Sequence, residues 1–147
     1  MIVLFGFQGF SFADPNTLGV LQKLRKDCRQ LLLEIYKDEN SFVRAAVLRA
    51  AGESYDTGLI QLLKKGVEDY YPTARLFALQ GLKEVSKIAA LEAARKLTDD
   101  HDIWVRSAAV EMLGDEGGSE VVAEIRGYLK SYDVPLSLIH ISEPTRP

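Results

Sequence analysis

The sequence predicts an all-α fold, a solenoid in which antiparallel helix pairs follow one another every 31 residues. Shifting the sequence against itself by 31 residues superimposes three segments without a gap, 38–53, 69–84 and 100–115. Each segment begins with an aspartate, carries an arginine six positions later, and places its apolar residues at helical spacing. A single helix pair cannot bury both of its apolar faces, so the pairs are expected to stack. The recurring charged residues are Asp38, Arg44, Asp69, Arg75, Asp100 and Arg106.

The three segments are expected to form the second helix of each pair. Asn40 and Asp102 lie where an N-cap accepts a hydrogen bond from the first free amides, and Pro72 stands at the first helical position of the middle copy. Gly52 and Gly114 are expected to end their helices, because glycine adopts the left-handed conformation that terminates a helix. The apolar stripe expected in the core comprises positions 43, 46, 47, 50 and 51, then 74, 77, 78, 81 and 82, then 105, 108, 109, 112 and 113.

The first helix of each pair is expected in the intervening segments, which carry apolar stripes of their own. The 31-residue shift aligns Cys28 with Leu59, Ala90 and Val121, so Cys28 is expected in the core. As the only cysteine it excludes an intramolecular disulfide and a cysteine-based zinc site. The expected helices are Thr17–Tyr36, Thr57–Glu68, Lys87–Thr98 and Ser119–Lys130.

These residues resemble the HEAT-repeat superfamily, in particular the short phycobilisome-lyase (PBS-lyase) type, over Thr17 to about Pro135. That unit reads as an Asp, then Val-Arg, then an Ala-rich helix ending in Leu-Gly, and Val43-Arg44 and Val105-Arg106 open the two nearest copies. The middle copy departs from it, with Ala74 in place of Val and Lys83 in place of Gly. The resemblance implies a right-handed α-solenoid and says little about function, because one solenoid serves many tasks.

Both ends of the chain depart from the repeat. Residues 1–13 are apolar and uncharged and end in a small-x-small pattern, so they are either the remnant of a signal peptide or an apolar cap on the stack. The first alternative implies an extracytoplasmic protein and the second a cytoplasmic one. Residues 136–147 resemble a translated sequencing adapter and are expected to be non-native. This leaves a HEAT-like domain over 14–135, cut short in mid-repeat.

The arginines of the repeat have two interpretations. Guanidinium groups stacked along a surface suit an anion or phosphate ligand. The favoured alternative is a structural ladder in which each arginine pairs with a turn aspartate and ties neighbouring repeats together, because Arg and Asp recur together in every copy.

Neither a metal site nor a catalytic site is expected. Asp99-Asp100-His101-Asp102 is the only place where histidine and carboxylates crowd together, but it lies in a turn, where Asp102 serves as an N-cap. The genuine chain shows no Ser-His-Asp or Cys-His order and no Gly-rich phosphate loop. We therefore expect a non-enzyme without a cofactor.

The candidate partner-binding surface is the face of the second helices, which the family resemblance implies to line a concave groove. Positions 42, 45 and 49 and their equivalents are expected to point away from the core, and they vary between copies. Phe42 and Trp104 are of the kind that anchors interfaces, although each ring has the alternative of packing against a preceding turn as a wedge between repeats. The candidates are Phe42, Arg49, Leu76, Gln80, Trp104 and Glu111.

The function expected from these observations is a scaffold for protein–protein interaction, with a protein or peptide as partner. A subunit of a chromophore-lyase-like or other protein-modifying assembly is the alternative. The net charge of −3 and pI of about 5.4 argue against a nucleic-acid partner, because there is no excess of basic residues to neutralise phosphates. Thirteen apolar residues are too few for a membrane-spanning helix, which needs about 20.

Overall fold

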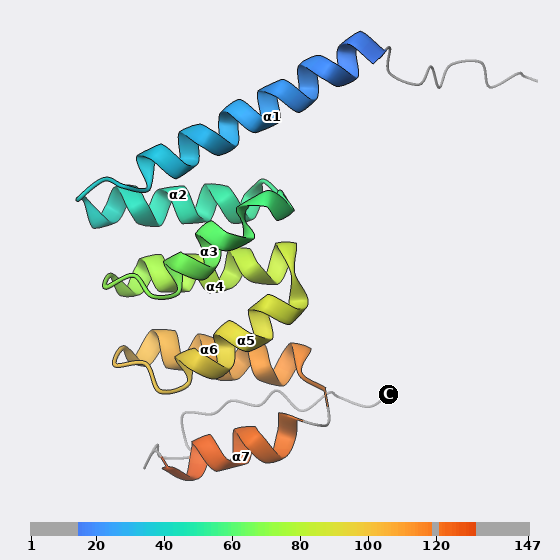
Figure 1. Cartoon of the computed structure of the whole chain (residues 1–147). Coiled ribbons are helices and arrows are strands. Elements are labelled where there is room, and N and C mark those ends of the chain that lie inside the picture. The colour runs from blue at the N-terminus through green and yellow to red at the C-terminus, as the bar shows by residue number, and fades with distance from the viewer. Residues whose placement is uncertain (1–14, 119–120, 132–147) are drawn as a thin grey trace, which may run out of the picture.

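The computed structural model describes residues 15–118 and 121–131, and this part of the chain is helical without any strand. Its architecture is a stack of helix pairs, consistent with an α-solenoid. In Figure 1, α2, α4 and α6 form one layer, and α3 and α5 lie in front of it. The elements are α1 (Pro15–Ile35), α2 (Ser41–Glu53), the 3₁₀ turn η1 (Thr57–Leu59), α3 (Ile60–Gly66), α4 (Pro72–Val85), α5 (Lys87–Leu97), α6 (Ile103–Glu116) and α7 (Val122–Ser131).

The starts of the second helices lie where the sequence predicts them. The Asn40 side chain accepts a hydrogen bond from the Phe42 amide at 2.9 Å, and Asp102 accepts from the Trp104 amide at 2.9 Å. Pro72 opens α4, where its missing N–H costs no hydrogen bond. Each second helix is therefore started by its own local sequence.

The predicted helix ends at Gly52 and Gly114 are wrong. Gly114 lies inside α6, which continues to Glu116. Gly52 is buried within α2 because the backbones of α2 and α4 approach each other closely there: a Cβ at Gly52 would lie 2.5 Å from the Cα of Gly81. Glycine is needed at this position for close packing of two helices, not for a left-handed turn.

The core lies between the two layers of helices. Leu48, Leu63, Leu79, Leu82 and Leu113 are completely buried in it. In α4 and α6 the predicted stripe is buried or half-buried throughout, so the predicted helical face is confirmed for these two helices.

In α2 the predicted face is partly wrong. Ala46 and Ala50 are exposed, whereas Ala45, expected to point away from the core, is buried. The corresponding residues of α4, Phe77 and Gly81, lie on the side that meets α2. Within the described residues no second helix precedes α2, so the alanines on that side stay in solvent.

The first helix departs from the stack. In Figure 1, α1 crosses α2 obliquely and its N-terminal half extends beyond it. The prediction that Cys28 is a core residue is wrong: its thiol-bearing side chain is exposed, whereas Leu59, Ala90 and Val121 are buried. A different face of α1 is attached to the stack through Arg29. This side chain donates to the Asp56 carboxylate from Nε at 3.0 Å and from Nη2 at 2.8 Å.

Two predictions fall outside the described residues. These are the signal remnant or cap over 1–13 and the non-native tail over 136–147. Among the helices of the described part, none has the length and apolar character to cross a membrane.

Candidate functional site

The arginine of the first copy lies at the junction of two helix pairs. Arg44 donates from Nε to Asp69 Oδ2 at 2.7 Å and from Nη2 to Asp69 Oδ1 at 3.0 Å. Its Nη1 reaches the carbonyl oxygens of Asp38 at 3.0 Å and Glu39 at 2.9 Å. One side chain thereby joins the turn before its own helix to the turn before the next second helix.

The same arrangement recurs in the next copy. Arg75 donates to the Asp100 carboxylate at 2.7 and 2.6 Å, and its Nη1 donates to the carbonyl oxygens of Asp69 and Tyr70. Arg106 donates to the Asp100 carbonyl at 2.6 Å. In the structure the guanidinium groups of Arg44 and Arg75 thus bind a carboxylate of the next repeat and carbonyl oxygens of the preceding turn, the arrangement that the structural interpretation of the ladder predicts.

The aspartates of the ladder also shape the turns. The Asp69 carboxylate accepts from the Tyr71 amide at 3.0 Å, and the Asp100 carboxylate from the Asp102 amide at 2.8 Å. Burial alone would raise the pKa of Asp69, but the hydrogen bonds from Arg44 and the Tyr71 amide outweigh it and leave the pKa below its ordinary value. Asp38 accepts from the Asn40 amide in the same way, but it is exposed.

Tyr36 adds a further bond at the first junction, and the repeat pattern did not predict it. The Tyr36 hydroxyl donates to Asp69 Oδ2 at 3.1 Å. Burial, and then the negative charge of Asp69, raise the pKa of Tyr36 to about 12. The aligned residues Val67 and Thr98 have no phenol, so the repeat frame could not predict this contact.

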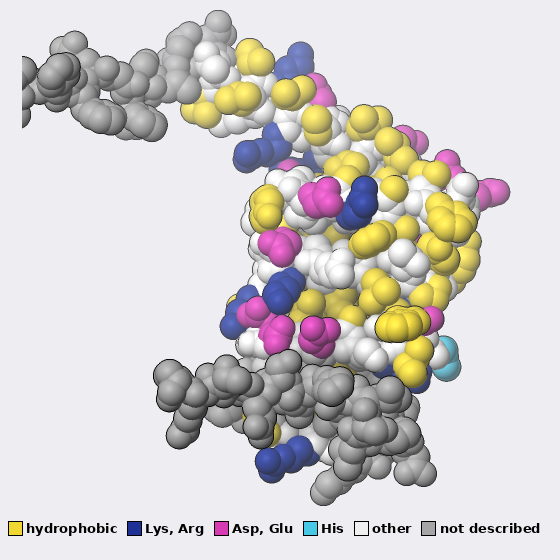
Figure 2. Space-filling model, turned by 180° about the vertical axis from the view of Figure 1, so that it is seen from behind, with side chains coloured by type: hydrophobic (Ala, Val, Ile, Leu, Met, Phe, Trp, Pro, Cys, Tyr) yellow, Lys and Arg dark blue, Asp and Glu magenta, His cyan; other side chains and the backbone are white. Residues whose placement is uncertain are grey.

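The ladder holds the N-terminal ends of the second helices, where large apolar side chains gather in solvent. Phe42 is 69% exposed and Trp104 is 73% exposed. Tyr70 and Ile103 are exposed beside them, and the Phe42 ring meets the Tyr71 ring edge-on with centroids 5.3 Å apart. In Figure 2, which views this layer from behind, hydrophobic side chains gather toward one edge and acidic and basic side chains toward the other. Phe42 therefore contacts the next repeat while presenting most of its surface to solvent.

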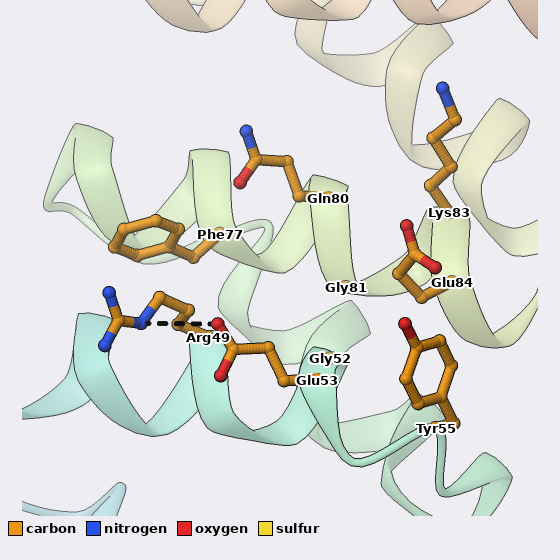
Figure 3. Close-up of a pocket in the computed structure, with 9 residues that line it drawn as sticks. All are labelled: Arg49, Gly52, Glu53, Tyr55, Phe77, Gln80, Gly81, Lys83 and Glu84. Carbon is orange, nitrogen blue, oxygen red and sulfur yellow. Dashed lines mark ion pairs between the residues drawn. The ribbon is translucent and has the colours of Figure 1, made fainter.

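A groove of about 330 Å³ lies between α2 and α4 (Figure 3). Two of the predicted site residues, Arg49 and Gln80, line it; Phe42, Leu76, Trp104 and Glu111 do not. Leu76 is half-buried against the core, and Glu111 is exposed on α6. The full lining is Arg49, Gly52, Glu53, Tyr55, Phe77, Gln80, Gly81, Lys83 and Glu84.

The groove combines an aromatic wall with paired charges. The Arg49 guanidinium lies over the Phe77 ring at 5.9 Å from its centroid and 3.7 Å from Glu53 Oε1. Lys83 lies 3.9 Å from an Asp115 oxygen and 3.5 Å from a Glu116 oxygen on α6. Figure 3 shows Tyr55 and Glu84 facing each other at one end of the groove. The site is amphipathic and nearly neutral.

Tyr55 was not predicted from the sequence because it lies beyond its helix, and its backbone conformation is unusual. Its φ is +51°, the only positive φ of a non-glycine residue in the described part of the chain. It lies two residues beyond Glu53, the last residue of α2, and its amide donates to the Gly52 carbonyl at 3.2 Å. A left-handed tyrosine is strained by about 1 kcal/mol or more, and such strain gathers at functional sites. Sequence position alone does not reveal it.

A family model described as HEAT repeats matches residues 58–136, more than half of the 147-residue chain. This chain belongs to the HEAT-repeat family. No curated protein matches it. HEAT repeats are commonly scaffolds for protein interaction and are generally non-catalytic.

The carboxylates that crowd around His101 in this HEAT-repeat chain have structural partners. Asp100 binds Arg75, and Asp102 caps α6. Over residues 15–118 and 121–131 there is no group of three or more His, Cys, Asp or Glu side chains that could hold a metal ion.

Proposed function

We propose that this HEAT-repeat chain is a non-catalytic scaffold that binds a protein or peptide segment along the face of α2, α4 and α6. The observation that carries the proposal is the groove between α2 and α4, which the Arg49, Phe77 and Tyr55 side chains line. Arginine and aromatic side chains are the residues most enriched at the energetic centres of protein interfaces.

The exposed aromatics extend this surface beyond the groove. Phe42 and Trp104 lie on the first turns of α2 and α6, and most of each ring is in solvent. A segment that crosses the stack from the groove toward these rings would contact three successive second helices. Such a length of contact suits an extended peptide better than a small molecule.

The charges of this surface argue against a nucleic-acid partner. Arg49 pairs with Glu53, and Lys83 pairs with Asp115 and Glu116, so the basic groups in the groove are already neutralised by carboxylates. Phosphate binding needs clustered Lys and Arg side chains that release counterions. The partner is therefore not expected to be polyanionic.

The finer assignment to the PBS-lyase type, with a right-handed array and a 31-residue unit, is part of the proposal. It is supported by the Arg75–Asp100 pair, which repeats the Arg44–Asp69 pair one unit later. This type supports the alternative function, a subunit of a chromophore-lyase-like or other protein-modifying assembly. Phycobiliprotein genes beside the gene for this chain would favour that alternative, and their absence would remove it.

The scaffold proposal can be tested without a known partner. Random peptides displayed on phage are selected on the immobilised full chain, and the enriched peptides are synthesised and titrated by calorimetry. We expect Phe42→Ala and Trp104→Ala each to weaken binding by roughly tenfold or more, as truncated interface anchors do, and Gln80→Arg to weaken it similarly because it places a larger, charged side chain in the groove.

The matched controls are Lys64→Ala and Lys96→Ala, two exposed residues on the layer of first helices. They should leave the affinity unchanged. Enriched peptides whose affinity depends on Lys64 or Lys96 and not on the second helices would contradict the proposed face, and a selection that enriches no peptide would contradict the proposed function.

A further inference from the structure

The charges that line the groove between α2 and α4 nearly cancel, but they are unevenly placed along it. Over residues 15–118 and 121–131, no side chain makes an ion pair or hydrogen bond with the Glu84 carboxylate. Its neighbour Lys83 extends away from it in Figure 3 and pairs with Asp115 and Glu116 of α6. One carboxylate of the groove is therefore left without a cation.

The second carboxylate of the groove is held only loosely. Glu53 lies 3.7 Å from the Arg49 guanidinium, and the two side chains are 70% and 61% exposed. Such an exposed pair contributes little, because water screens both charges. The Arg49 guanidinium also lies over the Phe77 ring. A cation that enters the groove beside Glu53 can therefore compete with Arg49 at little cost.

Both carboxylates stand at the C-terminal ends of their helices. Glu53 is the last residue of α2, and Glu84 is the last but one of α4. The last turn of a helix carries partial negative charge on its free carbonyl groups, which favours a cation there and disfavours a carboxylate. The two side chains add to this negative potential instead of offsetting it. This end of the groove is therefore complementary to a positive charge.

The same end of the groove offers an aromatic ring and a surface for an extended side chain. Tyr55 is 67% exposed, and its hydroxyl group points toward Glu84 in Figure 3. The face of an aromatic ring attracts a cation through its quadrupole. Gly52 and Gly81 line the groove without side chains, so a methylene chain can lie directly on the backbone there.

We propose that the groove recognises a basic side chain, lysine or arginine, of the bound peptide or protein segment. The charged group lies between the Tyr55 ring and the carboxylates of Glu53 and Glu84, and its methylene chain lies over Gly52 and Gly81. Complementary charge selects this occupant over an acidic or a purely apolar side chain. The inference rests on the proposed scaffold function and names the chemistry of its partner.

The first test uses the peptides that phage selection on the immobilised full chain enriches. We expect them to share a lysine or arginine, and replacement of that residue by glutamine should weaken binding by about tenfold or more in calorimetry. Enriched peptides that depend on Phe42 and Trp104 but share no basic residue would overturn this inference and leave the scaffold function standing. A selection that enriches no peptide would overturn both.

The second test exchanges the charges. Glu84→Lys should weaken binding of the basic peptide by about tenfold or more, and a peptide with glutamate in place of the basic residue should bind this variant more tightly than the native chain. Circular dichroism should show the variant folded and no less heat-stable than the native chain, because a cation suits the end of a helix.

Glu111→Lys is the matched control, because Glu111 is an exposed carboxylate of α6 that does not line the groove. It should leave the affinity nearly unchanged at constant ionic strength. Equal losses for Glu84→Lys and Glu111→Lys would overturn the proposal, since they would reflect long-range attraction and not a contact in the groove.

The aromatic part of the site is tested at Tyr55. Tyr55→Phe keeps the ring and should retain the affinity for the basic peptide, whereas Tyr55→Ala should lose about threefold or more. A Tyr55→Ala variant that binds as tightly as the native chain would overturn the position assigned to the basic side chain.

Discussion

Arg44 and Asp69 are charged side chains that the stack removes almost completely from water, each being only 8% exposed. Desolvating two charges costs several kcal/mol per ion, so a buried pair is tolerated only where every polar atom is satisfied. Here the carboxylate receives two bonds from Arg44, one from Tyr36 and one from the Tyr71 amide. The pair therefore fixes the register of neighbouring repeats, and its energetic importance appears mainly when one partner is removed.

Removing Asp69 should be far more costly than removing a surface charge. We expect Asp69→Ala to lower the free energy of unfolding by about 3–5 kcal/mol, because Arg44 is left buried without its counter-ion. Glu92→Ala, which breaks the exposed pair with Lys64, should cost less than about 1 kcal/mol. Urea denaturation followed by circular dichroism measures both.

The paired replacement Arg44→Met with Asp69→Leu is the control for desolvation. It should recover most of the loss, because it leaves no buried charge without a partner. Equal costs for Asp69→Ala and Glu92→Ala would contradict a structural role for the ladder.

Tyr36 should make the fold sensitive to alkali. Its folded pKa of about 12 lies above the ordinary value of 10, so the folded state holds this proton more tightly than the unfolded state. The corresponding stability is fully present below pH 10 and is lost as the pH rises toward 12. Urea denaturation at a series of pH values should show this loss in the native chain and a smaller loss in Tyr36→Phe.

The dependence of stability on pH in the acid range provides the internal control. Burial alone would raise the pKa of Asp100, but its bonds to Arg75 and to the Asp102 amide leave it below the ordinary range, so its contribution is lost as the pH falls below about 4. Tyr36→Phe should leave that contribution intact. An alkaline loss of the same size in both proteins would show that Tyr36 is not its source.

Some of these contacts could be predicted from the sequence. An arginine and an aspartate recur at the positions of Arg44 and Asp69 in every copy, so the periodicity of the sequence predicted their pairing across repeats. A tyrosine stands at this repeat position only in the first copy, and its partner Asp69 is 33 residues away. The neighbouring sequence therefore did not predict the contact. A periodic sequence pattern predicts only the contacts that all repeats share. A contact made by a residue that occurs in one repeat alone depends on which side chains the fold brings beside it.

At the scale of the helix, α2 and α4 approach each other closely at Gly52 and Gly81. The Cβ of an alanine at position 52 would lie 2.5 Å from Gly81 Cα, so the backbones would have to separate. We expect Gly52→Ala to destabilise the fold by about 1–3 kcal/mol, the usual cost of overpacking. Thermal and urea unfolding measure the change.

Gly19→Ala is the matched control within a helix. Nothing lies within 4 Å of a Cβ at Gly19, so the substitution should stabilise α1 by up to about 1 kcal/mol through helix propensity alone. If Gly52→Ala stabilised the fold, α2 and α4 could not approach each other as closely as described.

The starts of the helices were predictable, whereas the faces they bury were predictable only in part. Asn40, Pro72 and Asp102 act on their own first turns, so local sequence was sufficient. The face of α2 and the exposure of Cys28 depend on which helix lies alongside. The repeat frame misjudged the face of α2 because no second helix precedes it in the described part of the chain, and it misjudged Cys28 because α1 leaves the stack obliquely.

At the scale of the whole molecule, the ladder, the close approach of α2 and α4 and the proposed partner-binding face belong to one arrangement. The Arg–Asp pairs set the spacing of the second helices, and that spacing opens the groove between α2 and α4. The sequence predicted Arg49 and Gln80 in this surface because they point outward in the repeat frame. It missed Tyr55 and Phe77, because one lies beyond its helix and the other was assigned to the core.

The most direct test of the central claim is amide chemical-shift mapping by NMR, with a selected peptide added to the isotope-labelled full chain. The account predicts the largest shifts around the groove, at Arg49, Tyr55 and Gln80, with further shifts near Phe42 or Trp104. Shifts concentrated instead on the opposite layer, around Lys64 and Glu92 between α3 and α5, would contradict it.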